Sequence, residues 1–282
     1  MLETSNRRCY PILLACALAA SFTLSAQLSL SAEPISGAIE ATLVEFQTKD
    51  GVGERYYEYV PSNFDPKKKT TLIIALHGHG SEFGQVFLGA YKEYCATNDV
   101  AAKRNAVVIS PDYGSTTSWM GPKAEKDVVA IIAHQKEKRR YDKVIISGGS
   151  MGGSSAMTFT ALHPELIDGV VAMNGTANHL EYERFQDAIS ESFGGTKSEV
   201  PLEYKNRSAE YFPERFLGKP TAITLGSLDD VVPPDSARRL AHTIQKIGGT
   251  VVVIERADVG HATPYDESVQ AFDFVFDNLY SE

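Results

Sequence analysis

A serine set between glycines is the residue of this sequence best placed to do chemistry. Residues 148–152 have the sequence GGSMG, which centres a G-x-S-x-G pattern on Ser150. An apolar run precedes the pattern and a helix-forming sequence follows it, which is the context of a nucleophile elbow, a tight strand-to-helix turn. A serine at the tip of such a turn is forced towards positive φ, and side chains two residues away on either side would collide. Gly148 and Gly152 remove those collisions, so the sequence predicts an exposed nucleophile at Ser150.

The serine needs a base, because its hydroxyl is a poor nucleophile until the proton is removed. The chain has seven histidines. Three of them, His134, His163 and His242, lie in or at the end of predicted helices, where a surface or capping role is expected. His261 lies between the last predicted strand and the last predicted helix, on the loop where sheet enzymes of this kind carry their histidine. We therefore predict that His261 is the base.

A carboxylate should orient the histidine, and it should precede the histidine and follow the serine in the chain. Directly after a predicted strand, residues 226–233 have the sequence GSLDDVVP. Asp229 and Asp230 both fit the position, but only one of them can point at the imidazole. Asp229 follows the turn from the strand directly and is the preferred candidate.

Acyl transfer also needs two backbone N–H donors for the oxyanion. The residue after the nucleophile provides one of them, which here is Met151. The loop after the third predicted strand has the sequence HGHG at residues 77–80, and its glycines let the backbone approach a substrate closely. We assign the second N–H to His79, with Gly80 as the alternative. No metal site is indicated at His77 and His79, because no further cluster of ligands accompanies them.

Five more side chains lie on loops that we expect near the serine. They are candidates for the wall of a substrate site, and packing in the core or at the surface is the alternative for each. These residues are Phe83, Tyr113, Trp119, Thr176 and His179.

The candidates are carried by a chain in which predicted strands alternate with predicted helices. Two alternating segments, 41–46 and 55–60, predict an antiparallel hairpin. Apolar runs predict further strands at residues 71–76, 106–109, 143–146, 169–173, 221–225 and 250–255. Apolar residues at helical spacing predict helices at residues 87–102, 123–139, 151–162, 234–247 and 265–279. The sequence thus predicts an α/β fold, with a mostly parallel sheet covered on both faces and the hairpin at one edge.

The N-terminus differs from the rest of the chain. Arg7 and Arg8 precede an apolar run that ends at about Leu24, and small residues follow it. This order is typical of a secretory signal peptide, and the run is too short for a stable membrane span. We predict a leader over residues 1–32 and a secreted or periplasmic protein.

The end of the leader has two candidate positions, after Ala26 and after Ala32. The sequence before Cys16 is similar to a lipoprotein box, but the apolar run continues beyond this cysteine. A lipid anchor is therefore the less favoured alternative.

The remaining residues, 33–282, predict a single layered domain. The regular pattern weakens at about 175–217, where a charged helix over 180–192 and a polar loop predict a surface excursion or small cap. The net charge of −9 argues against nucleic-acid binding, which normally needs a basic face. Removal of the leader would leave Cys95 as the one cysteine, so the mature chain would form no intrachain disulfide.

The combination of these motifs resembles the α/β-hydrolase superfamily over nearly the whole chain after the leader. Within that superfamily the sequence is similar to secreted esterases of the feruloyl/acetyl-xylan esterase and polyhydroxybutyrate-depolymerase type. It is also similar to the catalytic domain of prolyl-oligopeptidase-like proteins, although no β-propeller sequence precedes the domain. The motifs that carry the first resemblance are residues 76–80, 148–152, 226–233 and 260–261. The looser motifs are Trp119 before an acidic helix and Gly194-Gly195 before residues 204–208.

The resemblance implies an α/β-hydrolase fold and a serine hydrolase that needs no cofactor. Ser150 would attack an acyl carbon while His261 takes its proton and Asp229 holds the imidazole, and water would then release the acyl group. We expect the substrate to be a carboxylic ester, either a small molecule or an acylated polysaccharide. A compact serine peptidase of the prolyl-oligopeptidase type is the alternative. A non-catalytic binding protein is the minor alternative. Such proteins usually lose a member of the triad, and this sequence keeps all three.

Overall fold

The computed structural model describes residues 37–281 of the chain. The predicted leader and its two cleavage positions lie outside these residues, so export and lipidation stay predictions. In the described part of the chain, no helix has the length and apolar character needed to cross a bilayer.

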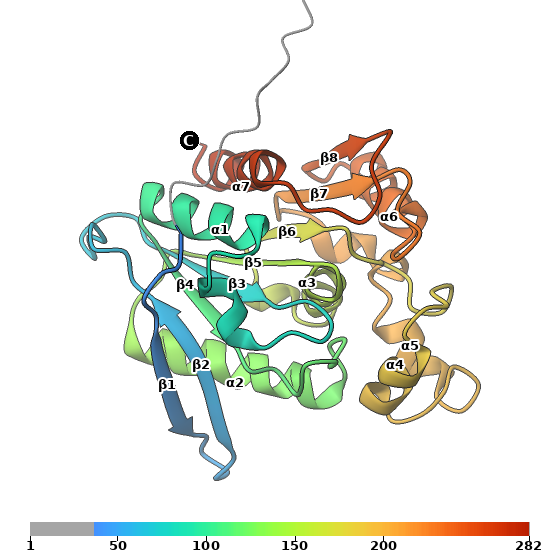
Figure 1. Ribbon diagram of the computed structural model, residues 1–282, viewed down its shortest axis with the longest axis horizontal. Coiled ribbons are helices and arrows are strands. Elements are labelled where there is room, and N and C mark those ends of the chain that lie inside the picture. Colours follow the sequence, from blue (N-terminus) through green and yellow to red (C-terminus); the bar gives the residue numbers. More distant parts are fainter. Residues whose placement is uncertain (1–36, 282) are drawn as a thin grey trace, which may run out of the picture. The chain divides into compact units, whose positions relative to one another are not determined.

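An eight-stranded sheet forms the centre of the fold, with the strand order β1-β2-β4-β3-β5-β6-β7-β8. The strands β1 and β2 run antiparallel to each other, β2 runs antiparallel to β4, and the other neighbours are parallel. Figure 1 shows the strands fanning from β8 to the β1–β2 hairpin at the opposite edge. The strands are β1 Thr42–Gln47, β2 Gly53–Tyr59, β3 Thr71–Leu76, β4 Ala106–Pro111, β5 Lys143–Gly149, β6 Gly169–Met173, β7 Thr221–Gly226 and β8 Val251–Arg256. This topology confirms the predicted fold class, including the antiparallel hairpin at one edge.

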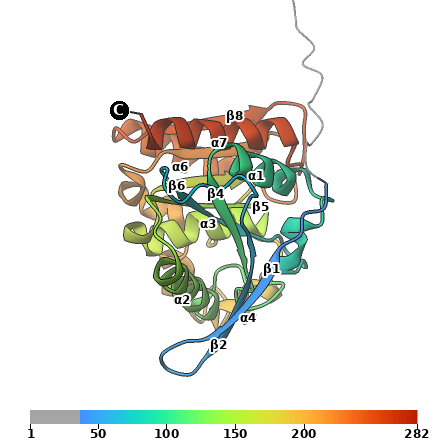
Figure 2. The same cartoon turned by 90° about the vertical axis from the view of Figure 1, so that its left-hand side faces the viewer.

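Helices cover both faces of the sheet, which is why the central strands are apolar throughout. The helices α1 and α7 pack on one face, where Phe272 and Phe276 contact a core that includes Ile73 and Ile145. The helices α2, α3 and α6 pack on the other face (Figure 2). The α-helices are α1 Lys92–Lys103, α2 Pro122–Lys138, α3 Met151–Leu162, α4 Gln186–Phe193, α5 Pro201–Asn206, α6 Asp235–Lys246 and α7 Tyr265–Leu279.

The helix predicted over 87–102 begins later than expected. A 3₁₀ turn at Phe83–Phe87 comes first, and α1 starts only at Lys92. Between them Gly89 has φ +73, which does not fit a right-handed helix. A Cβ on Gly89 would lie 2.5 Å from the main-chain nitrogen of Ala38, so the N-terminal backbone passes directly against this glycine. The sequence pattern could not reveal that contact. The predicted helix therefore joined the end of the 3₁₀ turn and α1 into one element.

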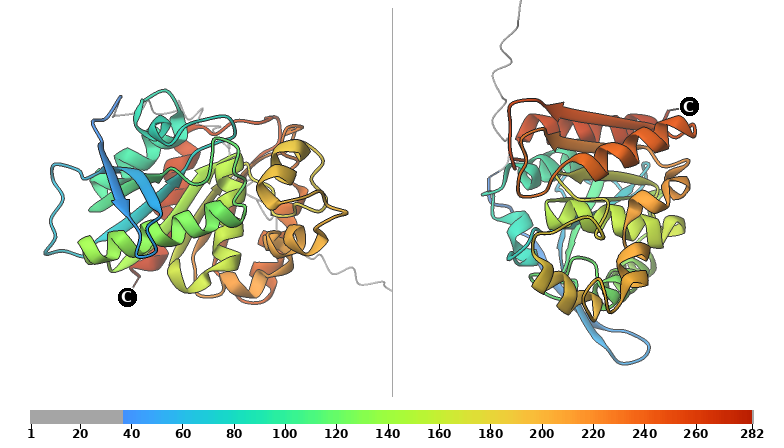
Figure 3. Two further views of the ribbon diagram at one scale, coloured as in Figure 1. Left: turned by 90° about the horizontal axis from the view of Figure 1, so that it is seen from below. Right: turned by 90° about the vertical axis from the view of Figure 1, so that its right-hand side faces the viewer.

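The excursion at 175–217 is also less helical than predicted. The charged helix expected over 180–192 is reduced to α4, because Phe185 at its start has φ +55. Before it, the Asn178 side chain accepts from the N–H groups of Leu180 and Glu181, which closes a turn in place of a helix. Figure 3 shows α4 and α5 on the side of the sheet away from the hairpin.

A buried arginine holds the excursion to α2. Arg207 has 4% of its side chain exposed and donates to Glu125 on α2 at 2.7 Å and to the Met120 carbonyl at 2.6 Å. It also pairs with Glu203, one turn earlier in its own segment, at 2.6 Å. The guanidinium therefore joins three chain segments through charge-assisted hydrogen bonds.

We expect Arg207→Ala to lower the free energy of unfolding by about 2–4 kcal/mol, because a buried charge pair loses one partner. Because Glu125 and Glu203 are partly exposed, water can hydrate them in the variant, and this limits the loss in the free energy of unfolding. Urea unfolding followed by circular dichroism measures it. Arg184→Ala is the matched control, since Arg184 is 55% exposed and pairs with Asp230 only at 3.8 Å; a loss below about 0.5 kcal/mol is expected there. Equal losses in the two variants would contradict the role of Arg207.

Candidate active site

The strand-to-helix turn between β5 and α3 has the strained geometry that its sequence predicts. Ser150 at its tip has φ +58 and ψ −119. A Cβ on Gly152 would lie 2.2 Å from the Leu76 carbonyl oxygen, and a Cβ on Gly148 would lie 2.5 Å from the carbonyl carbon of Gly152. These close approaches confirm that both positions require glycine. The Ser150 N–H donates to the Met173 carbonyl at 2.8 Å, which fixes the tip of the turn to β6.

Ser150, His261 and Asp229 form a continuous chain of hydrogen bonds. The Ser150 Oγ lies 2.9 Å from His261 Nε2, and His261 Nδ1 lies 2.7 Å from Asp229 Oδ2. Because the carboxylate accepts only, it places the ring hydrogen on Nδ1 and leaves Nε2 to accept from the serine hydroxyl. The second oxygen, Asp229 Oδ1, accepts from the N–H groups of Val231 and Val232 at 3.0 and 2.8 Å. The structure therefore brings Asp229 to the histidine, while Asp230 has 86% of its side chain exposed.

Asp229 and His261 come together because the turns after β7 and β8 pack backbone against backbone. A Cβ on Gly226 would lie 2.2 Å from the Gly260 carbonyl oxygen and 2.5 Å from that of Val259. The N–H of Leu228 donates to the Val259 carbonyl at 2.9 Å. The glycine at the end of β7 thus permits the approach that sets the spacing of the acid and the base.

The two N–H groups assigned to the oxyanion are both available. Among the interactions of residues 37–281, neither the His79 N–H nor the Met151 N–H donates a hydrogen bond. The Gly80 N–H donates to the Thr116 carbonyl at 2.8 Å, so the alternative assignment has its donor already engaged. His79 and Ser150 line the same cavity of about 220 Å³. An acyl oxygen at this position would find donors from two segments.

Trp119 holds the loop that carries His79. Its indole N–H donates to His79 Nδ1 at 3.0 Å, and the Phe185 ring packs at a tilt against the His79 ring with centroids 4.3 Å apart. Burial lowers the pKa of His79, which keeps the ring neutral and able to accept. Trp119 has no exposed surface, so the structure corrects its assignment to the substrate wall. It positions the oxyanion loop from the interior.

Three further wall candidates are also interior residues, which corrects the sequence-based assignment. Tyr113 is fully buried and donates its hydroxyl hydrogen to the His77 carbonyl at 2.7 Å. His179 is fully buried, and burial lowers its pKa to about 3, with Arg207 and Lys197 acting in the same direction. Thr176 is 3% exposed. Their positions on loops were predicted, but their side chains turn into the protein.

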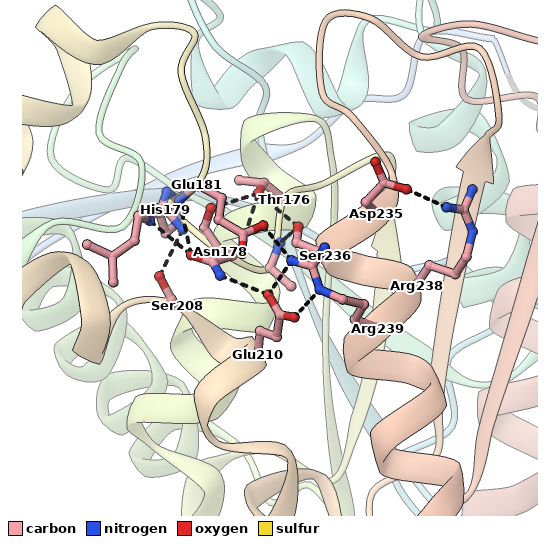
Figure 4. A network of polar contacts seen from close by, with 12 residues as sticks. Thr176, Asn178, His179, Glu181, Ser208, Glu210, Asp235, Ser236, Arg238 and Arg239 are labelled. Carbon is pink, nitrogen blue, oxygen red and sulfur yellow. Dashed lines mark hydrogen bonds and ion pairs between the residues drawn. The ribbon is translucent and has the colours of Figure 1, made fainter.

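Thr176 belongs to a polar network that fixes the excursion to α6 (Figure 4). Its hydroxyl lies 3.2 Å from the Ser236 hydroxyl, which also accepts from the Ala177 N–H at 3.0 Å. Asn178 donates to Glu210 at 2.9 Å, and Arg239 on α6 pairs with the same carboxylate. The network stabilises the loop after β6, and the cavity of about 430 Å³ that Thr176 lines does not include Ser150.

Phe83, the remaining wall candidate, does not line the cavity at Ser150. Its ring is 5.0 Å from that of Tyr57, and the Arg55 guanidinium lies over it at 5.1 Å. The cavity that it lines, of about 930 Å³, lies beside the hairpin and does not include Ser150. The structure therefore does not bring Phe83 to the candidate nucleophile.

The cavity at Ser150 contains residues that the sequence reasoning did not single out. Glu93 on α1 is 8% exposed, and Thr263 donates its hydroxyl hydrogen to this carboxylate at 2.7 Å. Asn174, directly after β6, has φ +46 and donates its side-chain amide to the Ala262 carbonyl. Glu93 lies within the helix predicted over 87–102, where a charged side chain is expected to face solvent. The position of Asn174 at the carboxyl end of a central strand could have identified it, because ligands bind at that edge of such sheets.

These side chains are equipped for acyl transfer through a serine. A nucleophile, a base, an orienting carboxylate and two oxyanion donors converge at the carboxyl ends of the parallel strands. Within residues 37–281, no three His, Cys, Asp or Glu side chains gather into a group suited to a metal ion.

Comparison with solved structures shows the same fold in large hydrolases. A putative dipeptidyl aminopeptidase IV from Bacteroides ovatus is 19% identical, with a TM-score of 0.69 over 84% of this chain and 35% of its own. A Mycobacterium tuberculosis puromycin-hydrolyzing peptidase is 18% identical, with a TM-score of 0.70 over 86% and 40%. The acylaminoacyl peptidase of Pyrococcus horikoshii is 15% identical, with a TM-score of 0.68 over 87% and 43%. The chain thus spans about two fifths of the length of these structures.

Comparison with curated protein sequences gives no match. The model of the prolyl oligopeptidase family matches residues 115–277, which is more than half of the chain and contains Ser150, Asp229 and His261. The chain therefore belongs to the prolyl oligopeptidase family, and it is a serine hydrolase with an α/β-hydrolase fold.

Proposed function

We propose that this protein is a serine peptidase that cleaves amide bonds of peptides or peptide-like small molecules through an acyl-enzyme at Ser150. The observation that carries the proposal is the hydrogen-bonded chain from Ser150 through His261 to Asp229 within the region that matches the family. The similar structures named above include an acylaminoacyl peptidase and a puromycin-hydrolyzing peptidase. Together with the match to the prolyl oligopeptidase family, these names favour the peptidase alternative over the predicted ester hydrolysis.

In this proposal each residue has one task. Ser150 Oγ attacks the carbonyl carbon and passes its proton to His261 Nε2, and Asp229 stabilises the imidazolium that forms. The oxyanion accepts from the N–H groups of His79 and Met151. His261 then gives the proton to the nitrogen of the leaving group as the C–N bond breaks. Water, activated by the same imidazole, attacks the acyl-enzyme and restores Ser150.

Acyl-matched substrate pairs test the reaction class. We expect a panel of short peptidyl aminomethylcoumarin amides to be hydrolysed at rates comparable with those of the matched aryl esters. A fluorophosphonate should label Ser150 in the same preparation. Each rate is corrected with the Ser150→Ala variant, so that spontaneous ester hydrolysis is not counted.

Two results would overturn the proposal. Turnover of the esters without turnover of the matched amides would establish the carboxylic-ester hydrolase predicted from the sequence. Absence of both turnover and labelling would point to the binding-protein alternative.

A further inference from the structure

The cavity of about 220 Å³ at Ser150 extends along the loop that carries the base. The side of this cavity away from His79 includes Ser150, His261, Gln85, Glu93, Asn174 and Thr263, and we call it the leaving-group pocket. The name follows from the chemistry, because His261 must donate a proton to the departing atom and that atom must therefore lie beside the imidazole. The inference below rests on the proposed function and concerns what this pocket selects.

The leaving-group pocket has an excess of hydrogen-bond acceptors. Glu93 is 8% exposed, and the Thr263 hydroxyl is the one side chain of the described residues that donates to it. In the same part of the chain, the buried Gln85 Oε1 and Asn174 Oδ1 accept no hydrogen bond. The Asn174 amide cannot turn round without losing its bond to the Ala262 carbonyl. Among the described residues, only the Thr263 hydroxyl and the N–H of Glu93 itself donate to this carboxylate, so all three side chains have oxygens short of donors.

The charge of Glu93 is equally uncompensated. Within residues 37–281 no lysine or arginine forms an ion pair with it, and the charge that acts on it is that of His261 when protonated. Burial raises the pKa of Glu93, and a cation beside the carboxylate would favour its ionised form. Buried carboxylates in proteins are normally paired, because removal of an isolated charge from water is unfavourable. An unpaired carboxylate beside a catalytic histidine indicates that a ligand supplies the missing partner.

The backbone allows the carboxylate to lie at the floor of the pocket. Gly149 directly precedes the nucleophile, and a Cβ there would lie 3.2 Å from Glu93 Oε1 and 3.4 Å from the Thr263 methyl group. A side chain at this position would crowd the carboxylate away from the nucleophile. Glu93 therefore acts at short range on whatever occupies the pocket.

We propose that the leaving-group pocket binds a protonated amine, so that the preferred substrates are peptides with a basic residue directly after the bond that is cleaved. An ammonium group brings three N–H donors and one positive charge. Glu93 supplies the countercharge and accepts from the ammonium, and the buried amide oxygens of Gln85 and Asn174 add to the negative potential around it. The ammonium keeps its protons during the reaction, since the proton that the leaving nitrogen gains comes from Ser150 through His261.

Three internally quenched peptides that differ only in the residue after the cleaved bond test this specificity. With lysine, norleucine and glutamate at that position, we expect kcat/KM to be about tenfold higher for lysine than for norleucine, and lowest for glutamate. Glu93→Gln keeps the size of the side chain and removes the charge, so the ratio of lysine to norleucine should fall to about one. Glu93→Asp keeps a shorter carboxylate and should retain part of the preference.

Thr263→Val separates charge recognition from a positioning role of Glu93. This variant removes the hydroxyl that binds Glu93 and leaves the carboxylate in place, so the preference for lysine should persist. If Thr263→Val abolishes the preference as Glu93→Gln does, Glu93 acts by holding the loop of His261 and the proposal is wrong. The proposal is also overturned if Glu93→Gln retains the wild-type ratio.

The norleucine peptide distinguishes a failure of this inference from a failure of the proposed function. If the wild type cleaves it and reacts with fluorophosphonate but shows no preference for lysine, the peptidase assignment stands and the specificity is wrong. If the wild type cleaves none of the three peptides and is not labelled, both are overturned. Thermal unfolding of each variant shows that the ratios come from folded protein.

Discussion

Replacement of Ser150 by alanine is expected to lower kcat by about 10⁴–10⁶-fold, the range that loss of a serine nucleophile produces. Ser150 Oγ is the side-chain hydroxyl that lies within hydrogen-bond distance of His261 Nε2 among residues 37–281, and without it the base would have only water to activate. The oxyanion donors remain, so a residual rate above the uncatalysed one should persist. Initial rates on a peptide amide, measured at high enzyme concentration, give the size of the loss.

The fold should be unaffected by the same change. Alanine is subject to the same constraint at φ +58 as serine, and the side-chain bond that is lost is solvent-exposed. We therefore expect the melting temperature of Ser150→Ala to match that of the wild type, while fluorophosphonate labelling disappears. Ser62→Ala, at an exposed loop position, is the control for a serine outside the site. Turnover that survives in Ser150→Ala would rule this residue out as the nucleophile.

Asp229→Asn is expected to lower kcat by about 10⁴-fold, because the asparagine holds the imidazole in the wrong tautomer. The reason lies in the main chain. The N–H groups of Val231 and Val232 both donate to Asp229 Oδ1, so the carbonyl oxygen of an asparagine would remain there and its NH₂ would face His261. The ring would then accept at Nδ1 and carry its hydrogen on Nε2, where it can no longer take the proton of Ser150.

The neighbouring aspartate is a matched control for this second prediction. Asp230→Asn makes the identical chemical change one residue away, at a side chain that is 86% exposed and 3.8 Å from Arg184. We expect its kcat to stay within about threefold of the wild type, as a surface substitution outside the reacting groups should. Similar losses in both variants would mean that the loop, and not the Asp229 carboxylate, is responsible.

The sheet and the turn that carries the serine could be predicted because both follow from local rules. Strands such as β3 and β7 are mostly apolar and every residue in them is buried, and a parallel sheet covered on both faces produces that pattern. Gly148 has a steric reason within five residues of chain, at Gly152, whereas Gly152 is also required by the close approach of Leu76 on β3. The order of serine, aspartate and histidine then narrowed the choice to two adjacent aspartates. The carboxylate that meets the histidine depends on the turn after β7, which only coordinates show.

The wall of the site could not be predicted, because the direction of a loop side chain depends on distant residues. Trp119 was expected near the serine and does reach the oxyanion loop, but Phe185 and Tyr182, far along the chain, cover it. For two charged residues the error was the reverse, because side chains expected at the surface are buried. Glu93 and Arg207 are of types that usually face solvent, and nothing in their sequence neighbours shows that both are buried.

The close contact at Gly226 determines which positions of the site can vary in an evolving or designed sequence. Main-chain bonds from Ser227 to Arg256 and from Leu228 to Val259 hold the two turns together. Side chains take no part in those bonds, and the Leu228 side chain is 64% exposed. A mutant library can therefore randomise Leu228, and so reshape the rim of the site, while Asp229 and His261 keep their register. At Gly226 itself any side chain would separate the turns, so this glycine should be retained in every active member of the library.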